Sequence, residues 1–78
     1  MKLFLTAHAQ TRMRQRKISE TDIQWVLVDP DEIEEYNGEA MAMRAGEERL
    51  LKVVYELVAD DTYKIITAIA QRRRTRRR

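Results

Sequence analysis

Three residues near the N-terminus have the types and the spacing of a phosphate-binding group. His8, Arg12 and Arg16 follow one another at intervals of four residues, so in a helix they lie one turn apart along the same side. Ala9 and Met13 form a neighbouring row, displaced by about 60° around the helix axis. If this second row enters a core, the first presents an imidazole and two guanidiniums at its edge. Two fixed positive charges beside one imidazole suit a phosphate group better than other common ligands.

Length and composition bound the class of protein that must position these residues. With 78 residues, 44% of them hydrophobic and 36% charged, the chain is one small folded domain with a thin margin of stability. Cysteine is absent, which excludes disulfides and thiolate metal sites and favours a reducing compartment. No apolar run approaches the roughly 20 residues that cross a bilayer, and the short apolar start is too short for a signal peptide. We therefore expect a cytoplasmic protein without a membrane partner.

The net charge of +2 hides a strong segregation of charge along the chain. Residues 1–17 hold five basic and no acidic residues, whereas residues 18–61 hold all 13 acidic residues against three basic ones. Residues 62–78 hold the remaining seven basic residues. This asymmetry predicts one basic face for a polyanion and an acidic surface elsewhere. The alternative is that both are merely solvated surfaces.

Local signals predict two helices. Thr6 is a suitable N-cap for a first helix over residues 7–16. Ser19 and Asp22 have the spacing of a capping box for a second helix. That helix is expected to end at Asp29-Pro30, since the residue before a proline is driven out of the helical region.

After the second helix the pattern changes to that of strands. Residues 33–36 and 40–44 flank Asn37-Gly38, the strongest short-range signal for a two-residue hairpin turn. Residues 49–58 and 63–70 alternate in the manner of two further strands. The short connections predict an α+β domain over residues 1–70, in which both helices pack on one face of a four-stranded antiparallel meander. Lys2 to Leu5 is either a short strand or an extended lead-in.

Two motifs, His8-Ala9-x-x-Arg12-Met13-x-x-Arg16-x-Ile18 and Ile23-x-x-Val26-Leu27-x-x-Pro30, stand in the N-terminal half of the chain. They resemble those of the domain-of-unknown-function 4258 family of small bacterial proteins. The likeness is closest in the helices and looser through the strands. More distantly, that family is similar to the RelE/BrnT-type toxins and related ribonucleases, which implies helices against a four-stranded antiparallel sheet, RelE/barnase-like. The family usually has glycine where Lys17 stands here, and a lysine is strained in the left-handed conformation that glycine adopts.

The resemblance implies toxin-like, metal-independent endoribonuclease activity. Such cleavage needs a base for the ribose 2′ proton, an acid for the leaving oxygen and cations for the charge that builds on phosphorus. His8 suits the acid or base role, and Arg12 and Arg16 suit a bidentate grip on the phosphate. Further catalytic candidates, chosen from chemistry and strand position, are Lys52, Tyr55 and Thr67.

Further cations are predicted to bind nucleic acid. Each arginine that meets a phosphate adds salt-dependent affinity, and residues 71–78 form a low-complexity basic tail that we expect to be disordered. RNA is the expected partner, and an acidic protein such as an antitoxin is the alternative. The predicted nucleic-acid-binding residues are Arg14, Lys17, Arg72, Arg73, Arg74, Arg76, Arg77 and Arg78.

Other interpretations of the same residues stay open. One histidine offers no pair of nitrogen ligands, and the acidic residues lack a ligand spacing, so we expect neither a metal nor a cofactor. Arg12 and Arg16 also suit a structural role, bonded to helix carbonyls or to acids such as Glu20 and Asp22. The competing functions are a non-catalytic RNA- or DNA-binding module and a small protein-interaction domain. The sequence leaves the oligomeric state open.

Overall fold

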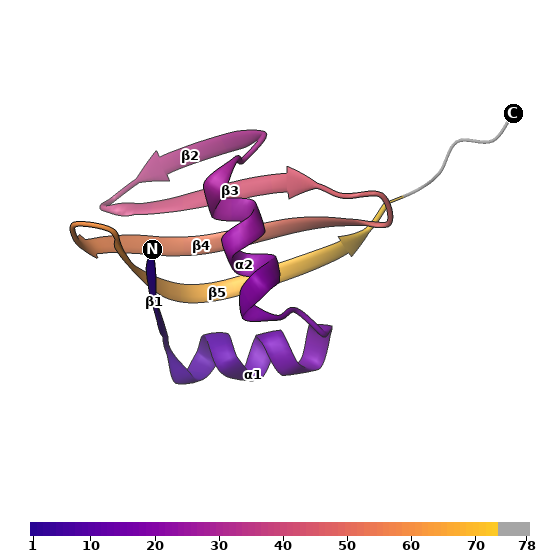
Figure 1. The fold of residues 1–78 in the computed structure, drawn as a ribbon, viewed down its shortest axis with the longest axis horizontal. Coiled ribbons are helices and arrows are strands. Elements are labelled where there is room, and N and C mark those ends of the chain that lie inside the picture. The colour runs from indigo at the N-terminus through magenta and orange to yellow at the C-terminus, as the bar shows by residue number, and fades with distance from the viewer. Residues whose placement is uncertain (74–78) are drawn as a thin grey trace, which may run out of the picture.

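The computed structural model describes residues 1–73 and shows two helices packed on a five-stranded mixed sheet with the order β1-β5-β4-β3-β2 (Figure 1). The predicted α+β class is confirmed, but the prediction of four antiparallel strands is wrong. Arg74, Arg76, Arg77 and Arg78 of the predicted tail lie outside the described residues. The elements are β1 (Lys2–Leu5), α1 (Ala7–Arg16), α2 (Glu20–Val28), β2 (Glu32–Tyr36), β3 (Glu39–Ala45), β4 (Arg49–Ala59) and β5 (Thr62–Arg72).

The additional strand is β1, which pairs in parallel with β5 at the edge of the sheet. Its register runs from Lys2 opposite Thr62 to Leu5 opposite Ile65. Four residues carry too little alternation to mark a strand by themselves, and the partner strand lies at the other end of the sequence. The pairing is therefore set by tertiary structure. The helices α1 and α2 carry the chain from β1 to the far edge of the sheet at β2, and the strands β2 to β5 then return to lie beside β1.

The strand β5 also runs two residues further than expected. Gln71 and Arg72, which the sequence places in the tail, pair with Leu50 and Arg49 of β4. Both side chains are exposed, so hydrophobic patterning gives no sign of this extension. Backbone hydrogen bonds to a long neighbouring strand are sufficient to hold these residues in the sheet.

The helix starts follow the predicted capping. The Thr6 side chain accepts a hydrogen bond from the Ala9 backbone N–H at 3.0 Å. Ser19 and Asp22 form a complete capping box, with hydrogen bonds of 2.9 and 3.1 Å. Each such cap satisfies backbone donors that a helix start leaves unpaired, and contributes about 1 kcal/mol.

The hairpin between β2 and β3 turns at Asn37-Gly38 as predicted, with Tyr36 directly opposite Glu39. Asn37 has φ 54° and Gly38 has φ 79°. Positive φ at both central residues is the geometry of a type I′ turn, whose twist matches that of the strands.

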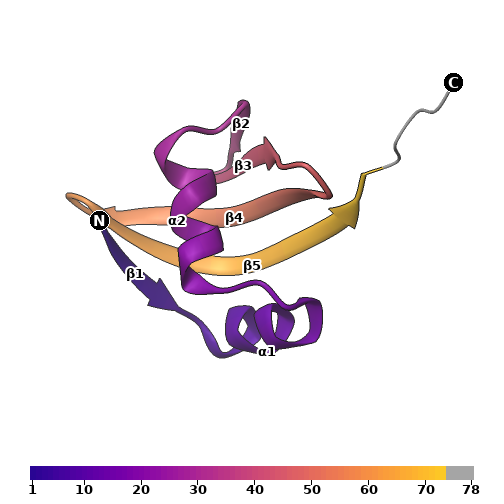
Figure 2. The ribbon, with the colours of Figure 1, turned by 45° about the vertical axis from the view of Figure 1, so that its right-hand side comes forward.

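The core lies between the helices and one face of the sheet (Figure 2). Met13 of α1 and Ile23 and Val26 of α2 are buried against Val53 of β4 and Ile65 of β5. Fully burying a side chain of this size contributes about 1.5–3 kcal/mol, so this layer fixes α1 against β5 and α2 against β3 and β4. Within residues 1–73, no helix is long and apolar enough to cross a membrane.

Candidate functional site

The predicted row of His8, Arg12 and Arg16 divides into two parts. The Arg12 Nε–H donates a hydrogen bond to His8 Nε2 at 3.4 Å, and Arg12 Nη1 donates to the Gln15 side chain at 3.1 Å. His8 is exposed and Arg12 half-buried on the surface of α1. The structure therefore brings the imidazole and the first guanidinium together, at the start and middle of the helix.

Arg16 is anchored elsewhere. Its Nη1 donates a hydrogen bond of 2.8 Å to the backbone carbonyl of Ala68 in β5. Eight residues of helix place Arg16 roughly 12 Å along the axis from His8. A single phosphate does not span both ends of the row. Arg16 thus has the structural role that the sequence left open, and it also lines a separate cavity.

The three candidates on the strands fall on both faces of the sheet. Val53 and Ala68 are buried under the helices, so their sequence neighbours Lys52 and Thr67 point to the opposite face. Tyr55 lies on the helix side, where its ring packs against Tyr63 with centroids 5.3 Å apart. Lys52 and Thr67 are therefore separated from α1 and its histidine by the sheet.

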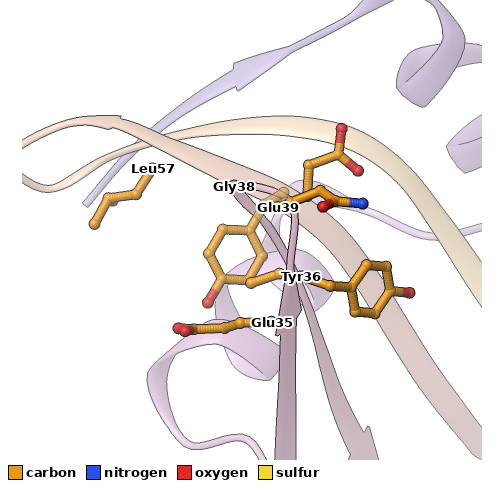
Figure 3. A pocket seen from close by; sticks show the side chains of 8 residues that line it. Glu35, Tyr36, Gly38, Glu39 and Leu57 are labelled. Atoms are coloured by element: carbon orange, nitrogen blue, oxygen red, sulfur yellow. The ribbon is translucent and has the colours of Figure 1, made fainter.

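Tyr55 belongs to an acidic cavity beside the β2–β3 hairpin. This cavity of about 440 Å³ is lined by Glu35, Tyr36, Glu39 and Leu57 among others (Figure 3). Burial raises the pKa of the Tyr55 phenol, and Tyr63 and Glu35 raise it further. A phenol held neutral among carboxylates is a poor partner for a phosphate and a poor general base.

The cations converge at the other end of the molecule. Arg16, Lys17, Arg49 and Arg72 line a cavity of about 590 Å³, which we call the basic pocket. The end of α1, the start of β4 and the end of β5 meet there (right in Figure 1). Glu48 is the one acidic residue in its wall. Four positive charges against one negative charge make this pocket suitable for an anion.

Arg49 connects the basic pocket to both helices and was not among the site residues predicted from the sequence. Its Nη1 donates 2.8 Å to the backbone carbonyl of Arg16, and its Nη2 lies 3.5 Å from a carboxylate oxygen of Asp22. Arg49 also stands directly opposite Arg72 across the β4–β5 ladder. Like charges in such a cross-strand pair are destabilising, and the ion pair between Arg49 and Asp22 offsets part of this repulsion. Arg49 and Arg72 are far apart in the sequence, and the alternation of residues along the strands does not indicate that the two lie opposite each other.

Lys17 enters the pocket from a strained backbone position. It has φ 56° and ψ 49° immediately after α1. Its N–H donates to the Arg14 carbonyl at 3.4 Å, and the Ile18 N–H donates to the Met13 carbonyl at 2.9 Å, which is a Schellman arrangement normally completed by glycine. A side chain in this left-handed conformation costs about 1 kcal/mol. The strain predicted for this position is present, and the lysine adds a cation where glycine would add none.

Arg14 and Arg73, which were also predicted to bind nucleic acid, do not line the basic pocket, and Arg14 lines a separate cavity with Met13 and Glu20. Arg14 is exposed on the last turn of α1. Arg73 follows β5, donating from its backbone N–H to the Glu48 carbonyl at 2.9 Å and from its side chain to the Gly46 carbonyl. The segment after β5 therefore starts against the β3–β4 turn, at the rim of the basic pocket. Within residues 1–73, no group of three metal-ligating side chains is placed to hold an ion.

Several glutamates lie on the edge strand β2, away from the basic pocket. Glu32, Glu34 and Glu35 lie in β2, an edge strand whose five residues are all exposed. In Figure 1 this strand is at the top of the sheet, whereas α1 lies below it. The glutamates of β2 thus lie apart from the basic pocket, whereas Asp22, Glu47 and Glu48 lie in or beside it.

Residues 5–70 match the family model described as "Domain of unknown function (DUF4258)". This region contains both helices and the strands β2 to β4, with most of β5. A search of curated proteins and a search of solved structures each give no match. The similarity to RelE/BrnT-type toxins stays a prediction.

Proposed function

The chain belongs to the DUF4258 family, defined by a domain of unknown function, and from this premise we propose that it binds single-stranded RNA through the basic pocket. The observation that carries the proposal is the convergence of Arg16, Lys17, Arg49 and Arg72 on one cavity. Guanidiniums held in fixed positions bind phosphate oxygens through paired, charge-assisted hydrogen bonds. Release of counterions from the nucleic acid adds to this affinity.

The concave shape of the pocket favours a single strand over a duplex. A flexible backbone can place a phosphate inside a cavity, whereas a duplex is bound by an element that lies in a groove or tracks along it. Glu48 lines the pocket together with the four cations. A carboxylate accepts a hydrogen bond from the ribose 2′-hydroxyl, which DNA lacks. This residue therefore favours RNA over DNA.

Two substitutions on one strand test the proposal. Arg72→Gln and Lys64→Gln each remove one positive charge from β5. Arg72 shares the helix side with Arg49, whereas Lys64 pairs with Glu56 and Phe4 on the opposite face. We expect the first change to weaken binding of a labelled 12-nucleotide RNA roughly five-fold near 0.1 M salt, since one phosphate contact is lost. Fluorescence anisotropy measures the dissociation constants.

The Lys64 variant is the matched control, with an expected change of less than two-fold. Equal losses in both variants would mean that RNA responds only to net charge, and failure of the wild type to bind would overturn the proposal. Circular dichroism of both variants shows whether the fold is retained.

Ribonuclease activity is a second candidate, supported by the exposed contact between His8 Nε2 and Arg12 Nε. In this hypothesis the imidazole accepts the proton of the 2′-hydroxyl as its oxygen attacks phosphorus, the bond from phosphorus to the 5′-oxygen breaks, and water gives a proton to the leaving 5′-oxygen. The guanidinium offsets the charge on the phosphate. The products are a 2′,3′-cyclic phosphate and a 5′-hydroxyl end. Incubation of RNA with the protein in a chelator tests this hypothesis. Cleavage that is lost in His8→Ala supports it, and intact RNA leaves binding alone.

A further inference from the structure

A second cavity lies directly beside the basic pocket. It has a volume of about 350 Å³, within the range of small-molecule sites. Its wall includes Trp25 of α2, Gly46 and Glu47 of the β3–β4 turn, and Glu48 and Arg49. We call it the indole cavity. Glu48 and Arg49 also line the basic pocket, so the two cavities share a wall.

Trp25 is fixed in place by its neighbours. The Arg44 guanidinium lies over one face of the indole, 4.2 Å from the ring centroid, and its Nη1 donates to the Trp25 carbonyl at 2.7 Å. At Gly46 a Cβ atom would stand 3.4 Å from Cη2 of the indole, so the turn packs closely along the ring edge. The half-buried indole thus has one face covered by a cation, packs partly against the core, and is one of the residues that line the cavity.

The chemistry of this cavity differs from that of the basic pocket. Asp22, Glu47 and Glu48 contribute carboxylates, and the guanidinium of Arg49 is already paired with Asp22 at 3.5 Å. Such a wall repels a phosphate. An aromatic ring with hydrogen-bond acceptors beside it suits a flat group that carries N–H donors, as an unstacked nucleobase does.

From this arrangement we propose that the indole cavity binds one base of the RNA strand whose phosphate occupies the basic pocket. This inference rests on the proposed function. A nucleotide presents phosphate, ribose and base in that order, and the protein presents a cationic cavity, a shared wall and an aromatic cavity in the same order. Glu48, in the shared wall, then faces the ribose 2′-hydroxyl, and Glu47 faces the edge of the base.

The acceptor at Glu47 gives a preference among bases. Cytosine, adenine and guanine each carry an exocyclic amino group, and a carboxylate accepts a hydrogen bond from it. Uracil presents a carbonyl oxygen at the same position, which repels a carboxylate. Binding is therefore stronger for C6 and A6 oligonucleotides than for U6, by about five-fold.

The protein has one tryptophan, so tryptophan emission reports on the indole cavity alone. Fluorescence of Trp25 and anisotropy of a labelled oligonucleotide are measured in parallel with C6, A6 and U6 RNA. Inorganic polyphosphate serves as an anion without bases. We expect C6 and A6 to quench Trp25 by about half at the same midpoint as the anisotropy, and polyphosphate to compete for binding without quenching.

A matched pair of variants tests whether Glu47 is the hydrogen-bond acceptor for the base. Glu47→Ala removes the acceptor from the cavity, and Glu34→Ala removes an equal charge from the distant edge strand β2. The first is expected to reduce the preference for C6 over U6 to less than two-fold, and the second to leave it unchanged. A retained preference in Glu47→Ala overturns the assignment of the acceptor.

Binding by anisotropy without a change in Trp25 fluorescence overturns the base site and leaves the RNA-binding proposal intact. Absence of binding overturns both. A tetra-lysine peptide that quenches Trp25 more strongly than C6 at equal concentration would mean that the cavity recognises a cationic side chain, and would also overturn the base site.

Discussion

The basic pocket and the acidic edge strand β2 carry charge in two different ways. In the pocket, each of three residues is fixed by the fold, because Arg16 binds the Ala68 carbonyl, Arg49 binds the Arg16 carbonyl and Lys17 is held in a left-handed turn. Along β2 the glutamates are exposed, and none of them forms an ion pair within residues 1–73. Charged side chains that the fold fixes in position are typical of a binding site. Exposed charges on an edge strand protect it from pairing with other strands.

Replacing Arg49 is expected to have the largest effect, because this side chain both ties β4 to the helices and supplies charge to the pocket. Arg49→Ala removes a hydrogen bond from a charged donor and leaves Asp22 without its ion-pair partner, at an expected cost of about 2 kcal/mol in the free energy of unfolding. RNA affinity should fall about ten-fold or more. Urea denaturation and anisotropy measure the two effects.

Replacing an exposed charge on the edge strand β2 is expected to change stability much less than replacing Arg49. Glu34→Ala should change the free energy of unfolding by less than about 0.5 kcal/mol. Equal destabilisation by the two variants would contradict the distinction between held and exposed charges.

Replacing Lys17 is expected to move stability and binding in opposite directions. Lys17→Gly relieves the left-handed strain and should raise the free energy of unfolding by about 1 kcal/mol. The same change removes one cation from the basic pocket and should weaken RNA binding roughly three-fold. Thermal melts and anisotropy are the measurements. A variant with both higher stability and undiminished affinity would show that the lysine has no part in binding.

Neutralising the acidic edge is expected to act on association more than on RNA. In the triple variant Glu32→Gln, Glu34→Gln and Glu35→Gln, RNA affinity should rise less than two-fold, because salt screens charges beyond about 10 Å. The edge strand should become freer to pair with a second copy. Analytical ultracentrifugation over a range of concentrations detects this. A ten-fold gain in RNA affinity would mean that the edge lies close to the bound RNA.

The smallest expected effect concerns Tyr55 at the acidic end. Its pKa is raised above the ordinary value of 10.0, first by burial and then by Tyr63 and Glu35. The folded state therefore holds the phenolic proton more tightly than the unfolded chain. This stabilisation is complete below pH 10 and is lost as the pH rises through the raised pKa. Tyr55→Phe should reduce the fall in the free energy of unfolding above pH 10, as followed by urea denaturation. If the variant lost stability above pH 10 as the wild type does, the raised pKa of Tyr55 would not be the cause of this loss.

Features that depend on neighbours in sequence were predicted well. Thr6, Ser19 and Asp22 cap their helices, and Asn37-Gly38 turns the hairpin, because each acts on backbone groups within a few residues. The strain at Lys17 belongs to the same group, since it follows from the end of one helix.

Features that depend on distant partners were not predicted. The parallel pairing of β1 with β5, the anchoring of Arg16 on Ala68 and the pairing of Arg49 with Arg72 each join distant parts of the chain or of the sheet. Helical spacing placed His8, Arg12 and Arg16 on one side of α1, but it gave no information on which of them the sheet would bind. The basic pocket was therefore identified only in part, through Lys17, Arg16 and Arg72.

The most direct measurement is an amide chemical-shift map of the protein during titration with a short single-stranded RNA. The proposed binding mode predicts the largest shifts at residues 16–18, 48–50 and 70–73, which surround the basic pocket, and small shifts in β2. Shifts that are largest around His8 and Arg12, or on the strand face that carries Lys52 and Thr67, would contradict it.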